Sequence, residues 1–491
     1  MERVLYGKKT AYMMSPGYSA TSTPKSEFLK LIDLMEYFFV SRPASGRREG
    51  FEYQRVMYFN PETENSSKQT DVSGVAEAFI AFTENFRKRT DFVAEYDHRF
   101  VKSTKLLEIF VQVENSEFII GLGLNRQACN EHDYFVHMSS LKALLIRTYE
   151  TFRLFYGTFS GLFETGKGIL MQRLDQFFSH YLSLLRVHQI PLIDLFSGVG
   201  FMNMPPVDYL DVQCLISRCS ESFPMIKKTL FLYQDKLVEY SVSKNDIIVV
   251  YRYLTQHLIQ SAVQSELKPV ASATYRETET KKFIGKFITG VTEEFIGQEE
   301  SVDHQFPNVF LSDENGKMIS HALIAYRALN ATFCLFVKNE DMPSLDLQEL
   351  QQSLDSELSR LASNIGDNVS SITRLITSSD IPFHYVYYNP DSLSLKTSFV
   401  DSPNDLSNVP LPPPAIYKQV CETFDHFIET DTEKFAQVCC KADDDWWVVV
   451  KKVNGRVLTL FIPSTPTSNI TDIHDIVEQI IKSYFLNLFI V

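Results

Sequence analysis

The chain has 491 residues, enough for about three domains of ordinary size, and its content of 44% hydrophobic and 22% charged residues is that of a globular protein. The 61 acidic residues outnumber the 47 basic ones, so the net charge is −14, which argues against a broad nucleic-acid surface and against direct attraction to anionic lipid headgroups. Seven cysteines without a Cys-x-x-Cys pair indicate reduced thiols in a cytosolic protein.

The N-terminal residues 1–28 are rich in Ser, Thr and Gly and contain no long apolar core, which predicts a flexible segment without a secretory signal. The first element expected after it is a buried strand over residues 35–40, dense in aromatic side chains. Residues 42–50 combine proline, two glycines and charges, and therefore predict a turn. A second strand is expected over residues 54–59.

A helix is predicted over residues 71–86, with Asp71 as its N-cap. At the helical period one side is apolar and is expected to cover a sheet; it consists of Val72, Val75, Ala76, Phe79, Thr83 and Phe86, flanked by Ile80 and Phe82. The opposite side is small and polar, with Gly74, Ala78, Ala81 and Asn85 bordered by Glu77 and Glu84. Small side chains let another backbone approach closely, but alanine is also simply the best helix former, and the helix alone favours neither explanation.

Three further strands complete a five-stranded sheet, and two long amphipathic helices follow; the strands are expected over residues 92–102, 105–114 and 117–125, and the helices over 137–155 and 169–188. Together these elements form a first domain over residues 29–195. A linker rich in Gly, Pro and Met is expected to run irregularly over residues 196–224.

The same order of elements recurs twice, in a second domain over residues 225–375 and a third over residues 380–491. For the second domain the pattern predicts a hairpin, a helix, four strands and a helix over residues 229–240, 246–263, 283–292, 309–311, 318–327, 332–337 and 343–365. For the third it predicts two strands, a helix, three strands and a final helix, the middle elements lying over residues 415–428, 434–440, 446–451 and 457–462. The fold class is therefore α+β, with three mostly antiparallel five-stranded sheets flanked by helices.

Short motifs near both ends of the chain resemble the Ccz family. The N-terminal motifs are Phe38-Phe39-Val40 with Pro43, Arg48-Glu49-Gly50-Phe51-Glu52, and Val56-Met57-Tyr58-Phe59-Asn60-Pro61. The C-terminal motifs are Trp446-Trp447-Val448-Val449, Lys451-Lys452, Gly455-Arg456 and Phe485-Leu486-Asn487-Leu488-Phe489. Between them the resemblance is patchier, so the limits of the middle domain are the least secure.

This resemblance implies three longin (roadblock/profilin-like) domains and a role as one subunit of a heterodimeric guanine nucleotide exchange factor. The obligate partner would be a Mon-like longin subunit, and the substrate a late-endosomal Rab GTPase of the Rab-seven type, with room for a further regulatory subunit. The protein would be cytoplasmic and peripheral on late endosomes, lysosomes or the vacuole, held at the membrane only indirectly, and would act in endosome maturation and autophagy. A longin adaptor without exchange activity, for vesicle tethering or ciliary trafficking, is the alternative.

No motif predicts covalent catalysis, a cofactor or a metal. Gly161-Leu162-Phe163-Glu164-Thr165-Gly166-Lys167-Gly168 resembles a phosphate-binding loop but has glycine where a Mg²⁺-binding hydroxyl is needed and a helix where a buried strand is needed. Gly121-Leu122-Gly123, His132-Asp133 and Asp443-Asp444-Asp445 each lack the rest of the motif they suggest. A metabolic enzyme with a site assembled from distant residues stays open as a third class, which a deep pocket lined by titratable groups would favour.

The candidate site is therefore a protein-binding surface, because nucleotide exchange makes and breaks no covalent bond. It combines the small side of the 71–86 helix with charged residues of the preceding turn; its members are Arg48, Glu49, Arg55, Gly74, Glu77, Ala78, Ala81, Glu84 and Asn85. The sequence does not divide these residues between the Mon-like partner and the GTPase. Arg48 and Glu49 have a simpler alternative, a local ion pair in an exposed turn that contributes about 0 to 1 kcal/mol.

Overall fold

The computed structural model describes most of the chain; its described residues are 30–86, 96–131, 138–185, 198–264, 285–289, 306–376, 383–398, 416, 435–442, 446–463 and 468–485. The chain forms two compact units, of which the larger comprises Pro24–His188 and Pro206–Asn364 and the other Met1–Thr23, Gln189–Pro205 and Ile365–Val491. Three sheets are present, and every pair of neighbouring strands in them is antiparallel. This confirms the predicted α+β class.

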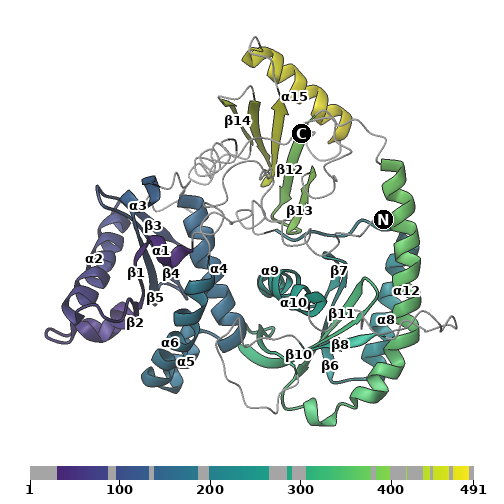
Figure 1. Ribbon diagram of the computed structural model, residues 1–491, viewed down its shortest axis with the longest axis horizontal. Coiled ribbons are helices and arrows are strands. Elements are labelled where there is room, and N and C mark those ends of the chain that lie inside the picture. Colours follow the sequence, from purple (N-terminus) through teal and green to yellow (C-terminus); the bar gives the residue numbers. More distant parts are fainter. Residues whose placement is uncertain are drawn as a thin grey trace, which may run out of the picture. The chain divides into compact units, whose positions relative to one another are not determined.

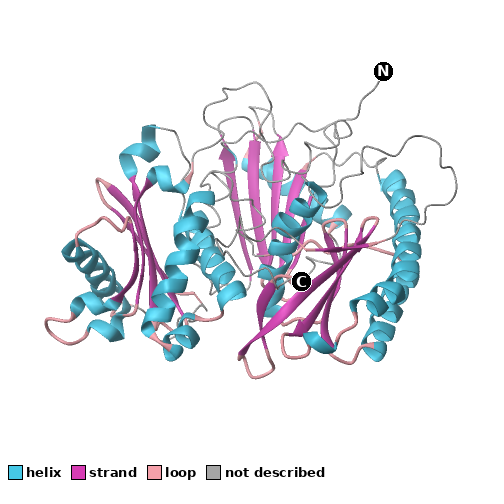
Figure 2. Ribbon diagram, turned by 60° about the horizontal axis from the view of Figure 1, so that its bottom comes forward, coloured by secondary structure: helices cyan, strands magenta, loops and turns pink. Residues whose placement is uncertain are grey.

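The first sheet has the five strands that the sequence predicted, in the order β2-β1-β5-β4-β3. The strands are β1 (Met35–Ser41), β2 (Val56–Asn60), β3 (His98–Lys102), β4 (Leu106–Val113) and β5 (Phe118–Asn125). Helix α2 (Ser66–Glu84) covers one face, while α4 (Met138–Tyr156) and α6 (Lys167–Leu184) cover the other (Figures 1 and 2). The short helices α1 (Leu31–Leu34), α3 (Arg126–Glu131) and α5 (Phe159–Thr165) complete the domain.

The aromatic residues of β1 join the two faces of this sheet. Tyr37 and Phe39 belong to the core under α2, whereas the Phe38 ring lies 4.9 Å from the Phe178 ring of α6. Phe39 pairs with Gly121 and Tyr37 with Gly123 on β5, and a Cβ at either glycine would overlap the opposite ring. Gly121-Leu122-Gly123 therefore makes room for aromatic side chains across the strand pair.

Two boundaries in the first half of this domain differ from the prediction, and a third cannot be compared. Helix α2 begins at Ser66 and not near Asp71, because the Asn65 side chain accepts a hydrogen bond from Ser67 N at 3.1 Å and caps the helix six residues before the predicted cap. The predicted second strand begins at Val56, since Glu52–Arg55 form the 3₁₀ turn η3 after another, η2 (Pro43–Gly46). The start of the strand expected from residue 92 lies outside the described residues.

The second sheet has six strands where five were expected. They are β6 (Ile226–Tyr233), β7 (Lys236–Tyr240), β8 (Lys286–Ile288), β9 (Asn308–Ser312), β10 (Met318–Ala328) and β11 (Ala331–Lys338), in the order β7-β6-β11-β10-β8 with β9 also paired to β10. The sequence predicted an irregular linker over residues 196–224. That prediction was wrong for the second half of the range, because Pro206–Ser222 form helix α8. One side of that helix is buried through Val212, Leu215 and Cys219. The prolines and methionines that flank it had suggested a loop.

Helices cover both faces of the second sheet (Figures 1 and 2). One side has α8 and α12 (Leu347–Ile376), and the other has α9 (Lys244–Tyr253), the π-helical turn η5 (Leu254–Leu258) and α10 (Ile259–Gln264). The helix predicted from residue 343 begins at Leu347, after the turn η6 (Met342–Ser344), and buries the leucine stripe that its period indicated. Asp355 of α12 accepts hydrogen bonds from Tyr326 and, at 3.0 Å, from Gly285 N, which fixes the helix to the sheet.

The other unit contains the third sheet, with five strands in the order β13-β12-β16-β15-β14. They are β12 (His384–Asn389), β13 (Ser394–Thr397), β14 (Phe435–Ala442), β15 (Trp446–Val453) and β16 (Arg456–Pro463), and α15 (Ile470–Tyr484) packs on one face. Val199 forms a parallel bridge with Ser394. The helix expected over residues 415–428 lies outside the described residues except for Ile416, which is buried.

The glycines of β5 give a first prediction. Gly121→Ala should lower the free energy of unfolding by about 1 to 3 kcal/mol, because the added methyl group must displace the Phe39 ring in a packed core. Urea unfolding followed by circular dichroism measures this. Gly168→Ala is the matched control: nothing lies within 4 Å of a Cβ there, and alanine favours the α6 helix by up to about 1 kcal/mol. Equal stability of the two variants would contradict the packing described for β5.

Candidate functional site

Helix α2 covers the first sheet along a narrower face than its sequence suggested. Ser73, Ala76 and Ile80 are its buried residues. Two of these three side chains are small, so the helix lies close to the sheet and covers little of it to either side. Val72 and Phe79 pack against the margin of this core.

The prediction that Val75, Phe82 and Phe86 turn toward the sheet was wrong. Val75 is 63% exposed, Phe82 61% and Phe86 71%, and the Phe82 and Phe86 rings pack edge to face at 5.0 Å. Ala78 and Ala81 are also exposed, as the sequence predicted, and adjoin these larger residues on the helix surface. We call the five exposed residues Val75, Ala78, Ala81, Phe82 and Phe86 the α2 ridge. Isolated exposed apolar residues are common, but a contiguous exposed row on one helix marks a binding surface.

Arg55 holds the middle of α2 to the preceding turns. Its Nη1 lies 2.9 Å from Glu77 Oε2, its Nε donates to Glu52 O at 3.0 Å, and its Nη2 donates to Gly46 O at 3.4 Å. A Cβ at Gly74 would lie 3.3 Å from Arg55 Nη1. Gly74 and Glu77 were expected to face a partner, but both contact an arginine of their own chain.

Arg99 of β3 holds the C-terminal end of α2. Its Nη2 lies 3.0 Å from Glu84 Oε2, and its Nε donates to Thr83 Oγ1 at 2.6 Å. Asp97 Oδ1 lies 2.8 Å from Nη1 of the same guanidinium and fixes its orientation. Asn85 is the C-cap of α2 and is exposed beside the ridge. The two arginines therefore anchor the borders of the helix and leave the α2 ridge uncovered.

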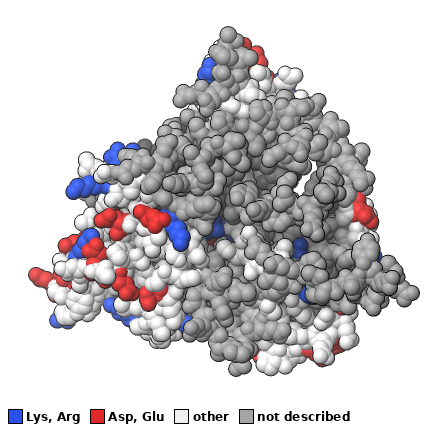
Figure 3. Space-filling view, in the orientation of Figure 1, with Lys and Arg blue, Asp and Glu red and all other residues white. Residues whose placement is uncertain are grey.

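Arg48 and Glu49 lie in the exposed turn that leads to η3. The Arg48 guanidinium carbon lies 5.0 Å from the centre of the Phe51 ring, and the Phe51 and Tyr53 rings are 6.3 Å apart. The described surface around the first domain carries acidic and basic side chains side by side, on the left in Figure 3. A mixed surface of this kind suits a protein partner better than a nucleic acid.

The motif that resembled a phosphate-binding loop forms a corner between two helices. Gly166 joins α5 to α6, and Lys167 Nζ donates to Gln54 O at 3.0 Å, so the lysine ties α6 to the η3 turn. The sequence interpretation of this stretch as an interhelical turn is confirmed. His132-Asp133 and Asp443-Asp444-Asp445 lie outside the described residues.

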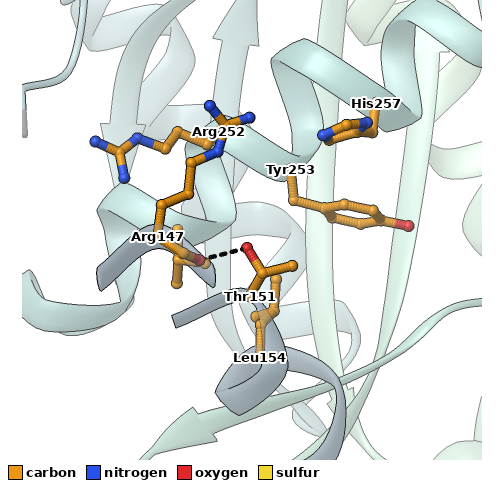
Figure 4. A pocket seen from close by; sticks show the side chains of 7 residues that line it. Arg147, Thr151, Leu154, Arg252, Tyr253 and His257 are labelled. Atoms are coloured by element: carbon orange, nitrogen blue, oxygen red, sulfur yellow. Dashed lines mark hydrogen bonds between the residues drawn. The ribbon is translucent and has the colours of Figure 1, made fainter. Parts of the chain in front are cut away.

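A small cavity lies between α4 and the α9–η5 helix, lined by Arg147, Thr151, Leu154, Val249, Arg252, Tyr253 and His257 (Figure 4). Its volume of about 10 Å³ leaves room for about one water molecule, not for a nucleotide. Burial, reinforced by the Arg147 charge, lowers the pKa of His257 to about 3. Within the described ranges no group of three or more His, Cys, Asp or Glu could hold a metal ion, and no helix has the length and hydropathy to span a bilayer.

Comparison with known proteins places this geometry in a family context. A model of the first longin domain of INTU, CCZ1 and HPS4 matches residues 35–157, and a model of INTU longin-like domain 2 matches residues 226–359. Two proteins named vacuolar fusion protein CCZ1 homolog, from Xenopus laevis and Nematostella vectensis, are 27% and 28% identical over 92% of this chain and 96% and 97% of their own lengths. A third, from Dictyostelium discoideum, is 22% identical over 93% of this chain and 98% of its own. These matches confirm the resemblance seen in the sequence motifs.

The two sides of α2 should respond in opposite ways to substitution. Ile80→Ala should cost about 2 to 5 kcal/mol of unfolding free energy, because it opens a cavity between α2 and the sheet. Phe82→Asp should change stability by no more than about 0.5 kcal/mol, since that ring is 61% exposed. Chemical denaturation of the isolated chain measures both, and a large loss from Phe82→Asp would show that the ridge is part of the core.

The histidine beside the cavity should make stability depend on pH. Its folded pKa lies below the ordinary value of about 6.5, so below pH 6.5 the unfolded chain binds a proton that the folded chain does not. This contribution to stability is complete above pH 6.5 and is lost as the pH falls toward about 3, by at most about 1.4 kcal/mol per pH unit. His257→Gln should flatten the stability curve between pH 6.5 and 4.5, whereas parallel curves for the two proteins would contradict this assignment.

Proposed function

We propose that this chain, a member of the Ccz family, is one subunit of a heterodimeric guanine nucleotide exchange factor for a late-endosomal Rab GTPase of the Rab-seven type. Relatives named as vacuolar fusion proteins align with 92% of the chain, which supports a role in vacuolar fusion and vesicle trafficking. The observation that carries the finer proposal is the α2 ridge, a row of exposed apolar side chains on the domain shared with CCZ1.

The apolar character of the ridge supports this proposal, because nucleotide exchange depends on protein binding alone. An exchange factor must bind the nucleotide-free GTPase more tightly than the loaded one, and that difference in affinity is the whole driving force. Covering one side chain such as Phe82 or Phe86 contributes about 1.5 to 3 kcal/mol, so a few of them supply a large share of a stable interface. Such a surface can draw a switch loop away from Mg²⁺ and the phosphates without any catalytic group on this chain.

The anchoring of α2 supports the same proposal. Arg55 and Arg99 each make at least three polar contacts around the helix, and both side chains are largely buried. A helix held in this way loses little freedom when a partner binds, so less binding energy is lost to ordering. Glu77 and Glu84 act as the anchors' counter-charges, while Ala78 and Ala81 let a partner's backbone approach.

The proposed partners are a Mon-like longin subunit and the GTPase, with a further regulatory subunit as a third component. The chain alone would be nearly inactive, because the exchange surface would be shared between two first longin domains. It would be cytoplasmic and peripheral on late endosomes, lysosomes or the vacuole, held there by its partners. The matching domain models also name INTU and HPS4, so a longin adaptor without exchange activity is the second candidate.

Substitutions on the ridge test the proposal. Phe82→Asp and Ala78→Arg, made separately, should each reduce formation of the complex with the Mon-like subunit or GDP release from the Rab by at least tenfold, because each places a charge in an apolar contact. Fluorescent GDP release with purified heterodimer measures exchange, and analytical gel filtration measures assembly. Leu210→Asp on α8 is the matched control, since Leu210 is also 61% exposed but lies in the second domain.

The outcomes separate the candidate functions. Loss of GDP release with Phe82→Asp and not with Leu210→Asp supports the exchange factor. Normal assembly and normal exchange by both ridge variants would remove the α2 ridge as the site. Failure of the wild-type heterodimer to accelerate release from any GTPase in a Rab panel would instead favour the adaptor.

A further inference from the structure

Helix α4 of the first domain and the α9–η5 helix of the second present polar side chains to each other within one compact unit. Arg147, Glu150 and Arg153 follow one another at intervals of three along α4 and lie on one face. Their counterparts are Gln256, Arg252 and Asp246, in reverse order along the chain. The two helices therefore face each other in antiparallel sense through three polar pairs, which we call the α4–α9 ladder.

The paired side chains of the ladder lie close to each other and are largely buried. Arg147 Nη2 donates to Gln256 Oε1 at 2.6 Å. Arg252 Nη1 lies 3.7 Å from Glu150 Oε2, with the two side chains 7% and 12% exposed. Arg153 Nη2 lies 3.6 Å from Asp246 Oδ1, with the side chains 13% and 3% exposed. Figure 4 shows Arg147 of α4 and Arg252 of α9 beside the small cavity between the two helices.

The Asp246 end of the ladder is fixed by the second domain itself. Asp246 Oδ2 accepts hydrogen bonds from Ser243 Oγ at 2.7 Å and from Ser312 N at 2.8 Å, and also from Ser312 Oγ. These bonds join the start of α9 to strand β9 and hold the carboxylate in place for Arg153. Arg153 Nη2 also donates to Asn245 O at 3.4 Å. The position of the Asp246 carboxylate is therefore set by hydrogen bonds within the second domain.

Apolar contacts alongside the ladder enlarge the interface between the two helices but do little to fix how the helices align. The Phe155 ring meets the Tyr253 ring at 5.0 Å, nearly at a right angle. Gly157, which ends α4, lies against the Phe310 ring of β9. Contacts of this kind tolerate several orientations, whereas buried charges do not: an unmatched buried charge costs about 3 to 5 kcal/mol. The order of charges on α4, positive, negative, positive, fits its partners in the observed register, because a shift by one position would place an arginine of α4 opposite Arg252.

We propose that the α4–α9 ladder selects the register in which the second domain packs on the first, so that the two open and close as one cooperative unit. Helix α4 covers the face of the first sheet opposite to α2 (Figure 1). The second domain thus supports the sheet against which α2 packs. The importance of this support for activity depends on the proposed function of the α2 ridge. The occupant of this face of α4 is the second domain of the same chain.

Charge reversal in the full chain tests the ladder without any partner protein. Glu150→Arg and Arg252→Glu should each raise the hydrogen-exchange rates of backbone amides in both α4 and α9 at least tenfold, because each places two positive or two negative charges together. The double variant Glu150→Arg/Arg252→Glu restores opposite charges and should return the rates to within about threefold of wild type. Glu150→Gln, which keeps the shape, is the milder variant should a reversal prevent folding, and should raise the rates in both helices.

The control is charge reversal at an exposed ion pair. Arg218 of α8 lies 3.0 Å from Glu357, and Arg218→Glu should leave exchange in α4 and α9 unchanged. Unchanged rates in the Glu150 variants, or a double variant as labile as the singles, would overturn the proposal. These measurements use the isolated chain, whereas the α2 ridge is tested by GDP release. The proposal for the ladder and the proposal for the ridge can therefore be contradicted independently.

Discussion

The close seating of α2 on the first sheet is the constraint on which the rest of the argument depends. Ser73 and Ala76 bring the helix near the strands, and Ile80 fills the space that remains. A helix seated so closely can turn only a narrow arc of its circumference inward, so the larger apolar residues beside that arc stay outside. The exposed aromatic row is thus a direct result of small residues at the contact.

The arginine anchors explain why the helix does not roll to bury those aromatic residues. Rotation would separate Glu77 from Arg55 and Glu84 from Arg99, and leave the largely buried Arg55 guanidinium without its carboxylate and that of Arg99 with Asp97 alone. Losing a partner from a buried charge costs more than covering one aromatic ring returns. The anchors therefore hold the ridge in a position that hydrophobic burial alone would not choose.

The sequence was sufficient to predict the strands and their grouping, because runs such as 35–40 alternate aromatic residues between two buried faces and are bounded by turn residues. It could not orient α2, since its apolar residues occupy two adjacent arcs and periodicity alone does not say which one the sheet covers. The anchors were missed for a different reason: Arg55 and Arg99 lie 22 and 15 residues from their carboxylates, and only the fold brings them together. Helix α8 was mistaken for a linker because it begins at a proline and follows a stretch rich in Gly, Pro and Met, which outweighed its three buried apolar positions.

The first domain reverses the usual distribution of side chains on two of its helices. On α2 aromatic residues face outward, and on α4 charged residues face inward toward the second domain. Each reversal is unfavourable for an isolated domain, because exposed aromatic surface and buried charge both raise its free energy relative to the ordinary arrangement. On α4 the second domain of the same chain supplies the matching charges and removes this cost. By the same reasoning, an apolar partner that covered the α2 ridge would remove the cost of its exposed aromatic side chains.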